Sequence, residues 1–308
     1  NIINIKNGLW VKDANKIKTL NRRREKILKS NTNDIEKIFW LLEDLKRYGT
    51  LPFAGLARAA FVSISLLKSL VKINILSNED YDNFLNSLST ISSSIKKDKN
   101  ILTKKEFILK YGHLRPGTYD IEYPRYIDDP KKYFKWNNQK INNNNVKKFK
   151  LTELQLNKIN QLIHFYKLKT NALDLFKFMK LSIELRESSK FYFTKNLSEA
   201  IEIIGKYGKK YNISKKQLAY TEISIYDKKL LSSYNPEKIL SENIKENKKK
   251  FEDLSRINLP YLITKPRNVW DFKSPKISPN FITNKRVVST ISDINNVKNI
   301  KNSIVCIP

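Results

Sequence analysis

Residues 34–49, DIEKIFWLLEDLKRYG, carry a pattern of apolar side chains that decides the fold class. The apolar positions recur every three or four residues, which places them on one face of a helix. They are Ile35, Ile38, Phe39, Leu42 and Leu45. Gly49 is expected to end this helix as a C-cap, and Leu51-Pro52 to break the chain after it. Because similar patterns recur along the first four-fifths of the sequence, we expect a mainly α, multi-helix fold.

Further helices are predicted from their termini and from apolar runs. A nearly all-apolar helix begins at Phe53, and the helix that follows Thr103 is expected to end at Gly112. Two separate helices are expected later in the chain, one over residues 171–192 and one over residues 198–207. Side chains that cap a first helical turn predict five helix starts. These residues are Ser77, Thr103, Thr152, Ser214 and Asn235.

The character of the sequence changes near residue 258. Short runs of β-branched or aromatic residues, separated by proline and asparagine, are typical of strands. They cover residues 259–263, 281–283, 287–291 and 304–307. The sequence therefore predicts a helical domain over residues 1–257 and a short β-containing segment over residues 258–308.

The formal net charge of +29 and the pI near 9.9 would fit a partner that is a polyanion. However, lysine far outnumbers arginine, and specific nucleic-acid readers favour arginine and interleave it with aromatic side chains. We therefore expect most lysines to form a solvated surface and do not expect nucleic acid as the partner. A basic helical module that binds nucleic acid or an acidic protein remains the alternative.

The sequence also bears on the compartment. Cys306 is the only cysteine, which excludes an intrachain disulfide and fits a reducing cytoplasm. The apolar run that follows Phe53 contains Arg58, Lys68 and Lys72, so a buried core helix is expected there rather than a membrane span. The chain begins at Asn1 and shows no secretory signal, and we expect it to be a piece of a longer cytoplasmic polypeptide.

Residues 111–126, YGHLRPGTYDIEYPRY, are too rich in glycine and proline for regular structure, so they predict a shaped loop. Arg115 and Arg125 could bind a carboxylate or a phosphate, and Asp120 could bind an ammonium group. His113 could donate or accept a proton. Alternatively, the polar groups of this loop could satisfy one another.

Two further sets of charged residues are candidates for a site. Arg58 has small and apolar neighbours one helical turn away, so its guanidinium requires an anion if it is buried. That anion could be an internal glutamate, such as Glu106 or Glu187, or an anionic substrate. On a predicted helix, Lys190 lies three residues after Glu187 and four after Arg186. These charges could form a surface ion pair or belong to a site.

Metal and nucleotide sites are not indicated. His113 and His164 are the only histidines, and neither has a carboxylate at ligand spacing. The chain contains no glycine-rich phosphate loop of the common patterns, and nothing marks a strained nucleophile turn. We therefore expect no metal and no cofactor in this chain.

Several stretches resemble a known family. Residues 111–125 hold a Tyr-Gly-His element followed by a Pro-Gly turn, an Asp and a Pro-Arg pair. Residues 48–61 read YGTLPFAGLARAAF, residues 186–191 read RESSKF, and PNFIT at 279–283 precedes IVCIP at 304–308. In this order, they resemble the middle region of phosphoenolpyruvate-synthase-like phosphotransferases, from about residue 35 to the end of the chain.

The resemblance implies a three-part enzyme. An upstream ATP-grasp-like domain, which binds ATP and Mg²⁺, phosphorylates a histidine on a mobile downstream domain, which then carries the phosphoryl group to an acceptor on the middle domain. The phosphohistidine domain would begin near residue 258, with its histidine beyond Pro308. The chain is most similar to members that phosphorylate the side-chain amide of L-glutamine for capsule phosphoramidate synthesis. Other members use pyruvate-like acids or antibiotics, and a spacer that contacts no substrate is a further alternative.

The resemblance also implies roles for individual residues. His113 would be the catalytic residue and assist proton removal from the acceptor. Asp120 or Glu187 would hold an α-ammonium group, and Tyr119 would contact the substrate. The cations around the acceptor and the phosphoryl group would be Arg58, Arg115, Arg125, Arg186 and Lys190. The isolated chain would bind its acceptor without turnover, because the nucleotide site and the reactive histidine lie on other domains.

Overall fold

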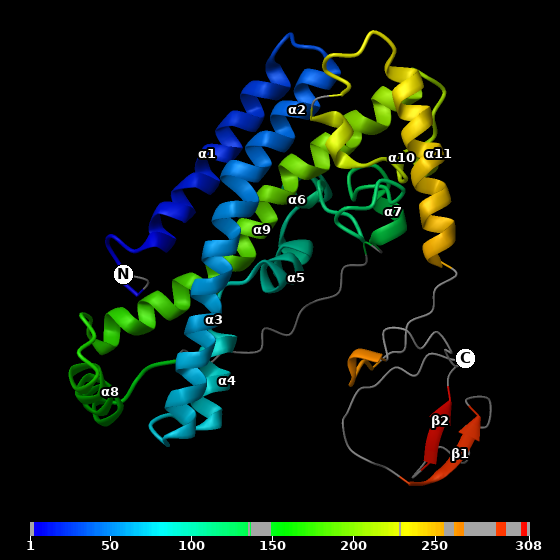
Figure 1. Ribbon diagram of the computed structural model, residues 1–308. Helices are drawn as coiled ribbons and strands as arrows, with labels where there is room; N and C mark the ends of the chain where they lie inside the picture. Colours follow the sequence, from blue (N-terminus) through cyan, green and yellow to red (C-terminus); the bar gives the residue numbers. More distant parts are fainter. Residues whose placement is uncertain are drawn as a thin grey trace. The chain divides into compact units, whose positions relative to one another are not determined.

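The computed structural model describes residues 3–134, 136, 149–227, 229–255, 262–267, 288–293 and 303–306. It is mainly helical, as predicted (Figure 1). Its contacts divide the chain into two units, Asn1–Lys245 and Glu246–Pro308. The division lies within helix α11 (Pro236–Ser255). The domain border expected at residue 257 lies outside the described residues and stays a prediction.

The first unit is organised around α9 (Ala172–Lys209), a helix of 38 residues. Helices α1 (Leu9–Lys29), α2 (Asp34–Asp44) and α3 (Leu51–Lys72) pack against it (Figure 1). The prediction of two separate helices in the α9 region is wrong. Ser198, the expected start of the second helix, is buried in the middle of α9, where its hydroxyl donates to the carbonyl oxygen of His113 at 2.8 Å.

The helix that begins at Asp34 does not end at Gly49, so that prediction and the expected break at Leu51-Pro52 are wrong. A π-helical segment, η1 (Leu45–Thr50), joins α2 directly to α3. A π-turn leaves a gap in the ladder of backbone hydrogen bonds. Pro52, which has no backbone N–H to donate, therefore destabilises the helix little at the start of α3. Gly49 is buried, and a Cβ atom on it would lie only 3.1 Å from Cβ of Phe193 on α9. The glycine therefore permits close helix packing.

The remaining helices of this unit are short. They are α4 (Asn78–Asn86), α5 (Ile91–Ile101), α6 (Lys104–Tyr111), α7 (Pro130–Tyr133), α8 (Glu153–Phe165), α10 (Lys215–Leu218) and the 3₁₀-helix η2 (Ile223–Tyr226). The capping boxes predicted at Ser77, Thr103, Thr152 and Ser214 are all confirmed. Asn235 accepts a hydrogen bond from the backbone N–H of Lys238 at 3.1 Å, as expected for an N-cap. Sequence reasoning missed α1, which begins without a side-chain cap.

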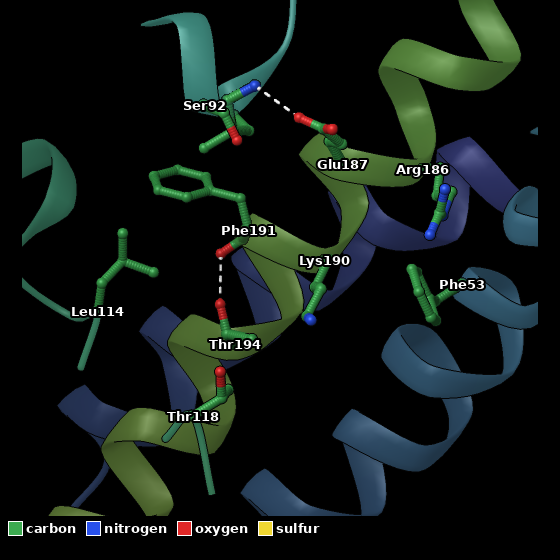
Figure 2. Close-up of a pocket in the computed structure, with 10 residues that line it drawn as sticks. Phe53, Ser92, Leu114, Thr118, Arg186, Glu187, Lys190, Phe191 and Thr194 are labelled. Carbon is green, nitrogen blue, oxygen red and sulfur yellow. Dashed lines mark hydrogen bonds between the residues drawn. The ribbon is translucent and has the colours of Figure 1, made fainter. Parts of the chain in front are cut away.

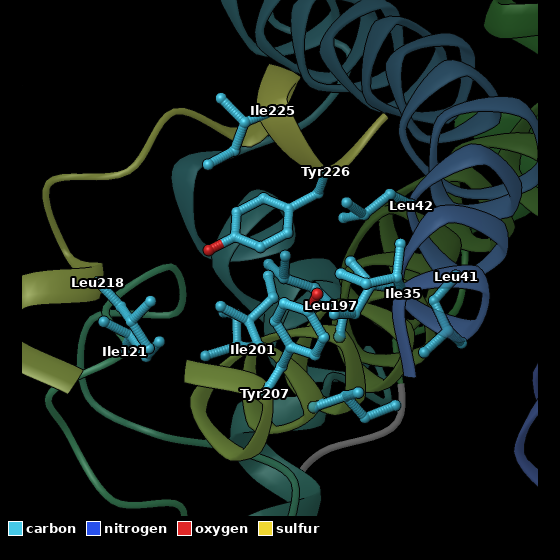
Figure 3. Close-up of a cluster of buried hydrophobic side chains, with 14 of the residues drawn as sticks. Ile35, Leu41, Leu42, Ile121, Leu197, Ile201, Tyr207, Leu218, Ile225 and Tyr226 are labelled. Carbon is cyan, nitrogen blue, oxygen red and sulfur yellow. The ribbon is translucent and has the colours of Figure 1, made fainter. Parts of the chain in front are cut away.

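Buried side chains form two large clusters along α9 and a small third one. The first surrounds the C-terminal half of α9 and includes α2 and η2 (Figure 3). The second surrounds the N-terminal half of α9 and includes α3 and α8. The third joins Phe107 and Tyr111 of α6 to Phe191 in the middle of α9. Because these clusters fix α9 along its length, its middle turns form a rigid support for the adjoining loop.

The stretch Asp34–Lys72 is long and apolar enough, by length and composition, to cross a membrane. Core helices of soluble proteins share this property. In α3 the side chains of Leu56, Ala59 and Leu67 are buried in the cluster that also contains Phe178 of α9.

The second unit contains a pair of parallel strands, β1 (Thr290–Asp293) and β2 (Ser303–Cys306). Thr290 lies opposite Ser303. These strands overlap the predicted runs at 287–291 and 304–307. The run at 281–283 lies outside the described residues, and Leu262 and Ile263, the described part of the first run, form no strand.

Candidate functional site

The loop that begins at Gly112 lies against α9. Gly112 is the C-cap of α6, as predicted. Two backbone hydrogen bonds close the loop, from Tyr126 to Leu114 at 2.8 Å and from Ile127 to Gly112 at 3.0 Å. Gly117 has a φ of +61°, a conformation that favours glycine. The expected shaped loop is therefore present, held at the end of a helix.

Arg115 is used to attach this loop to α9. Its side chain is only 1% exposed, and Nη2 donates to Glu202 Oε1 at 2.9 Å and to Ser198 Oγ at 3.3 Å. Nη1 donates to the carbonyl oxygen of Asp120 at 3.2 Å. Arg115 therefore binds partners within the protein. This agrees with the alternative left open by the sequence, in which the polar groups of the loop satisfy internal partners.

Arg125 extends these contacts into an ionic network around Glu202. It binds both carboxylate oxygens of Asp128, each at 2.9 Å, and lies 3.6 Å from Glu199. Lys215 contacts Glu202 at 3.2 Å. Burial alone would lower the pKa of Arg125, but the bonds to Asp128 and the charges of Glu202 and Glu199 raise it. The charged side chains of this network therefore pair with one another inside the fold.

His113 has the environment of a core histidine. Its Nε2 lies 3.1 Å from the carbonyl oxygen of Phe191, and the two rings are in edge contact, with centroids 4.7 Å apart. Burial, together with the positive charge of Lys195, lowers the pKa of His113 to about 3. The neutral ring therefore donates through Nε2. A group with this pKa is a poor proton acceptor near neutral pH, so the contacts of His113 do not favour its expected catalytic role.

This pKa leads to a prediction about stability. The unfolded chain protonates His113 below about pH 6.5, whereas the folded chain does so only near pH 3. The stability that His113 contributes is therefore complete above pH 6.5 and is lost as the pH falls. Relative to His113→Gln, the wild type should lose roughly 2 kcal/mol between about pH 6.5 and pH 5, measured by urea unfolding. Equal losses in both proteins would contradict a neutral, buried His113.

A cleft of about 360 Å³ lies beside the loop. Figure 2 shows Arg186 and Glu187 on one turn of α9 and Lys190 on the next, with Leu114 and Thr118 of the loop on one side and Phe53 of α3 on the other. The remaining lining residues are Ile91, Ser92, Phe191 and Thr194. The structure therefore brings the cluster from α9 together with the loop, although the two are about 70 residues apart in the sequence.

The cleft carries two cationic side chains and one carboxylate. Oε2 of Glu187 accepts a hydrogen bond from the backbone N–H of Ile91, at the start of α5, at 3.1 Å. The guanidinium of Arg186 lies 5.1 Å from the ring centroid of Phe61. Within the described part of the chain, Lys190 has neither a hydrogen bond nor an ion pair. Lys190 is thus a cation available to a ligand, and Glu187 keeps its second oxygen for one.

Arg58 is exposed on α3, so the premise that it is buried is wrong. Neither suggested internal partner holds it: Glu106 is bonded to Thr103 at 2.7 Å, and Glu187 to the start of α5. Arg58 does not line the cleft, but it lies three residues from Phe61 on α3, and Phe61 contacts Arg186. It is therefore near one edge of the cleft rather than inside it.

The other predicted loop residues also lie outside the cleft. Tyr119 is 70% exposed. Oδ1 of Asp120 accepts the backbone N–H of Glu122 at 2.8 Å, which stabilises the turn. Of the nine predicted site residues, the structure gathers Arg186, Glu187 and Lys190 in the cleft.

Sequence reasoning missed the hydroxyl-bearing residues of the cleft. Thr118 lies in the loop that the glycines and the proline had marked, so that signal could have found it. Ser92 lies two residues after Thr90, the N-cap of α5, a helix that was not predicted separately. Thr194 and Phe53 enter the cleft only through tertiary packing, and no local pattern indicates them.

Among the described ranges, no three His, Cys, Asp or Glu side chains gather as metal ligands. No protein-family model, curated protein or solved structure matches this chain.

Proposed function

We propose that the chain is the acceptor-binding middle domain of an ATP-dependent phosphotransferase that works through a phosphohistidine, and that the enzyme is an L-glutamine kinase. The overall reaction would convert ATP, L-glutamine and water to AMP, phosphate and amide-phosphorylated L-glutamine. One structural observation supports this proposal. The cleft unites the Arg-Glu...Lys element of α9 with the Tyr-Gly-His loop, two of the stretches that resemble the family.

The chemistry of the cleft suits a small zwitterionic acceptor. Arg186 and Lys190 would bind the carboxylate of an amino acid or the oxygens of an incoming phosphoryl group. The second oxygen of Glu187 would accept an ammonium group. The cleft volume of about 360 Å³ is within the range of small-molecule pockets. Phosphoryl transfer depends mainly on positioning and on cations near the developing charge, which this set of side chains would supply.

Under this proposal, ATP and Mg²⁺ would be bound by a domain outside this chain, and the phosphohistidine would come from another. The cytoplasm would be the compartment. The isolated chain would therefore bind its acceptor without hydrolysing ATP.

Isothermal titration of the chain with L-glutamine tests the proposal, with L-glutamate and pyruvate as controls. We expect saturable binding of L-glutamine and at least tenfold weaker binding of both controls, because a second carboxylate or a missing ammonium group fits the charges of the cleft less well. Preference for pyruvate would instead favour a phosphotransferase with another acceptor. If none of the three compounds bound, the result would contradict the acceptor-binding proposal.

The net charge of +29 supports a second candidate, a basic module that binds nucleic acid. On α11, however, basic side chains pair with acidic ones one turn away, as Lys238 does with Glu242 and Lys248 with Glu252. Binding of a single-stranded oligonucleotide whose affinity falls steeply with salt, and does not depend on Arg186, would favour this candidate.

A further inference from the structure

A second cavity, of about 420 Å³, lies between α1 and α9 and shares no lining residue with the cleft. We call it the α1–α9 groove. Its walls are mostly apolar, with a few hydroxyl and amide groups. Residues that line it include Ile17, Lys18 and Asn21 of α1, Leu56 of α3, and Ser188 and Tyr192 of α9. Its volume and its lining are those of a pocket for a small organic molecule.

Two cations lie at one end of this groove. Arg24 is one turn beyond Asn21 on α1, and its Nη1 donates to Asn21 Oδ1 at 3.0 Å. Lys195 is one turn beyond Tyr192 on α9, and its Nζ lies 5.8 Å from the Tyr192 ring centroid. Residues three apart on a helix share a face. Arg24 and Lys195 therefore continue the two rows of side chains that line the groove.

These cations are poorly neutralised by the protein. The side chain of Arg24 is 14% exposed, and its nearest acid, Glu25, is 3.9 Å away and 64% exposed. Among the described residues, Lys195 makes cation–π contacts with Phe191 and Tyr192 but neither a hydrogen bond nor an ion pair. Glu199, one turn after Lys195, contacts Arg125 instead, at 3.6 Å.

The electrostatics of the two groups agree with this geometry. Burial lowers the pKa of Arg24, although the charges of Glu199 and Glu25 act in the opposite direction. Burial also lowers the pKa of Lys195, and the positive charge of Arg24 acts in the same direction, although the charge of Glu25 opposes it. Two partly buried cations that repel each other are unfavourable unless an anion joins them. The N–H groups of Arg24 that lack a hydrogen-bond partner are not fully buried, so a ligand could reach them.

We propose that the α1–α9 groove binds a small organic anion, with its apolar body between α1 and α9 and its carboxylate or phosphate head between Arg24 and Lys195. This site is separate from the cleft and does not depend on the function proposed for it.

The test is calorimetric titration of the chain with octyl phosphate and octanoate, which distinguish a phosphate head from a carboxylate head. Inorganic phosphate, which lacks an apolar body, is one control. Octyltrimethylammonium, which has the same apolar chain with a positive head, is the control for the charge. We expect at least one of the two anionic amphiphiles to bind, inorganic phosphate to bind at least tenfold more weakly, and the cationic amphiphile not to bind. Equal binding of the cationic and anionic amphiphiles, or no binding of either anion, would overturn the proposal.

Variants locate the binding. Arg24→Gln and Lys195→Gln should each weaken binding of the anionic amphiphile at least tenfold, and Ser188→Leu, which fills the groove, should do the same without changing a charge. Arg47→Gln, at a side chain that is 67% exposed, is the matched control and should bind as the wild type does. Thermal unfolding of each variant shows that it is folded. Unchanged binding in all three groove variants, or loss of binding in Arg186→Gln of the cleft, would overturn the proposal.

Discussion

Glu202→Gln is expected to lower the free energy of unfolding by about 3 to 5 kcal/mol. Glu202 accepts from Arg115 at 2.9 Å and lies 3.2 Å from Lys215, so the substitution leaves the buried guanidinium of Arg115 without its carboxylate. A buried cation that has lost its partner is among the most costly defects in a protein interior. Urea unfolding at neutral pH measures the change.

Glu199→Gln is the matched control for this experiment. Glu199 lies one turn before Glu202 on α9, but its side chain is 32% exposed. Its contact with Arg125, at 3.6 Å, is longer than the 2.9 Å contact of Arg125 with Asp128, so Arg125 keeps a partner when Glu199 is replaced. A loss of less than about 1 kcal/mol is expected, as for exposed ion pairs. If the two variants lose equal stability, Arg115 and Glu202 do not attach the loop to α9 in the way described.

Replacing both cations of the cleft, Arg186→Gln with Lys190→Gln, is expected to weaken L-glutamine binding at least thirtyfold. A hydrogen bond to a charged group contributes about 1.5 to 3 kcal/mol, which is about tenfold or more in affinity for each cation. Both side chains are exposed on α9, so the stability of the variant should change little. Calorimetric titration with L-glutamine measures the loss.

Arg58→Gln serves as the control for the double variant. Arg58 belongs to the sequence stretch that resembles the family, yet the structure places it outside the cleft lining. We expect its substitution to change the affinity for L-glutamine by less than threefold. If Arg58→Gln abolished binding while the double variant did not, the acceptor would lie on the exposed face of α3 instead of in the cleft.

The features that the sequence predicted correctly depend on residues close together in the chain. Ser77, Thr103, Thr152 and Ser214 each bond to a residue three positions later, so their capping boxes can be read locally. The same holds for the loop after Gly112, whose glycines and proline restrict the backbone wherever the loop packs.

The features that the sequence did not predict depend on distant partners. Ser198 has the residue type of an N-cap, but its hydroxyl bonds to His113, 85 residues away. Gly49 has the residue type of a C-cap, but its missing side chain is needed for contact with Phe193.

Prediction of the candidate site was also limited by its dependence on distant partners. Arg115 was a plausible ligand-binding cation because its partner, Glu202, lies 87 residues further along the chain. Arg186 and Lys190 line the cleft, whereas Arg115 and Arg125 belong to the ionic network, and their local sequence patterns do not distinguish these positions. Only tertiary packing separates cations that face a cavity from cations that hold the fold together.

The central claim is that the acceptor binds in the cleft, and a nuclear magnetic resonance titration of the ¹⁵N-labelled chain with L-glutamine tests it most directly. We predict that amide shifts concentrate at residues of the cleft lining, including Ser92, Thr118, Lys190 and Thr194. Saturable shifts that instead concentrate around a separate pocket on α8, lined by Asn160 and His164, or no shifts at millimolar L-glutamine, would contradict it.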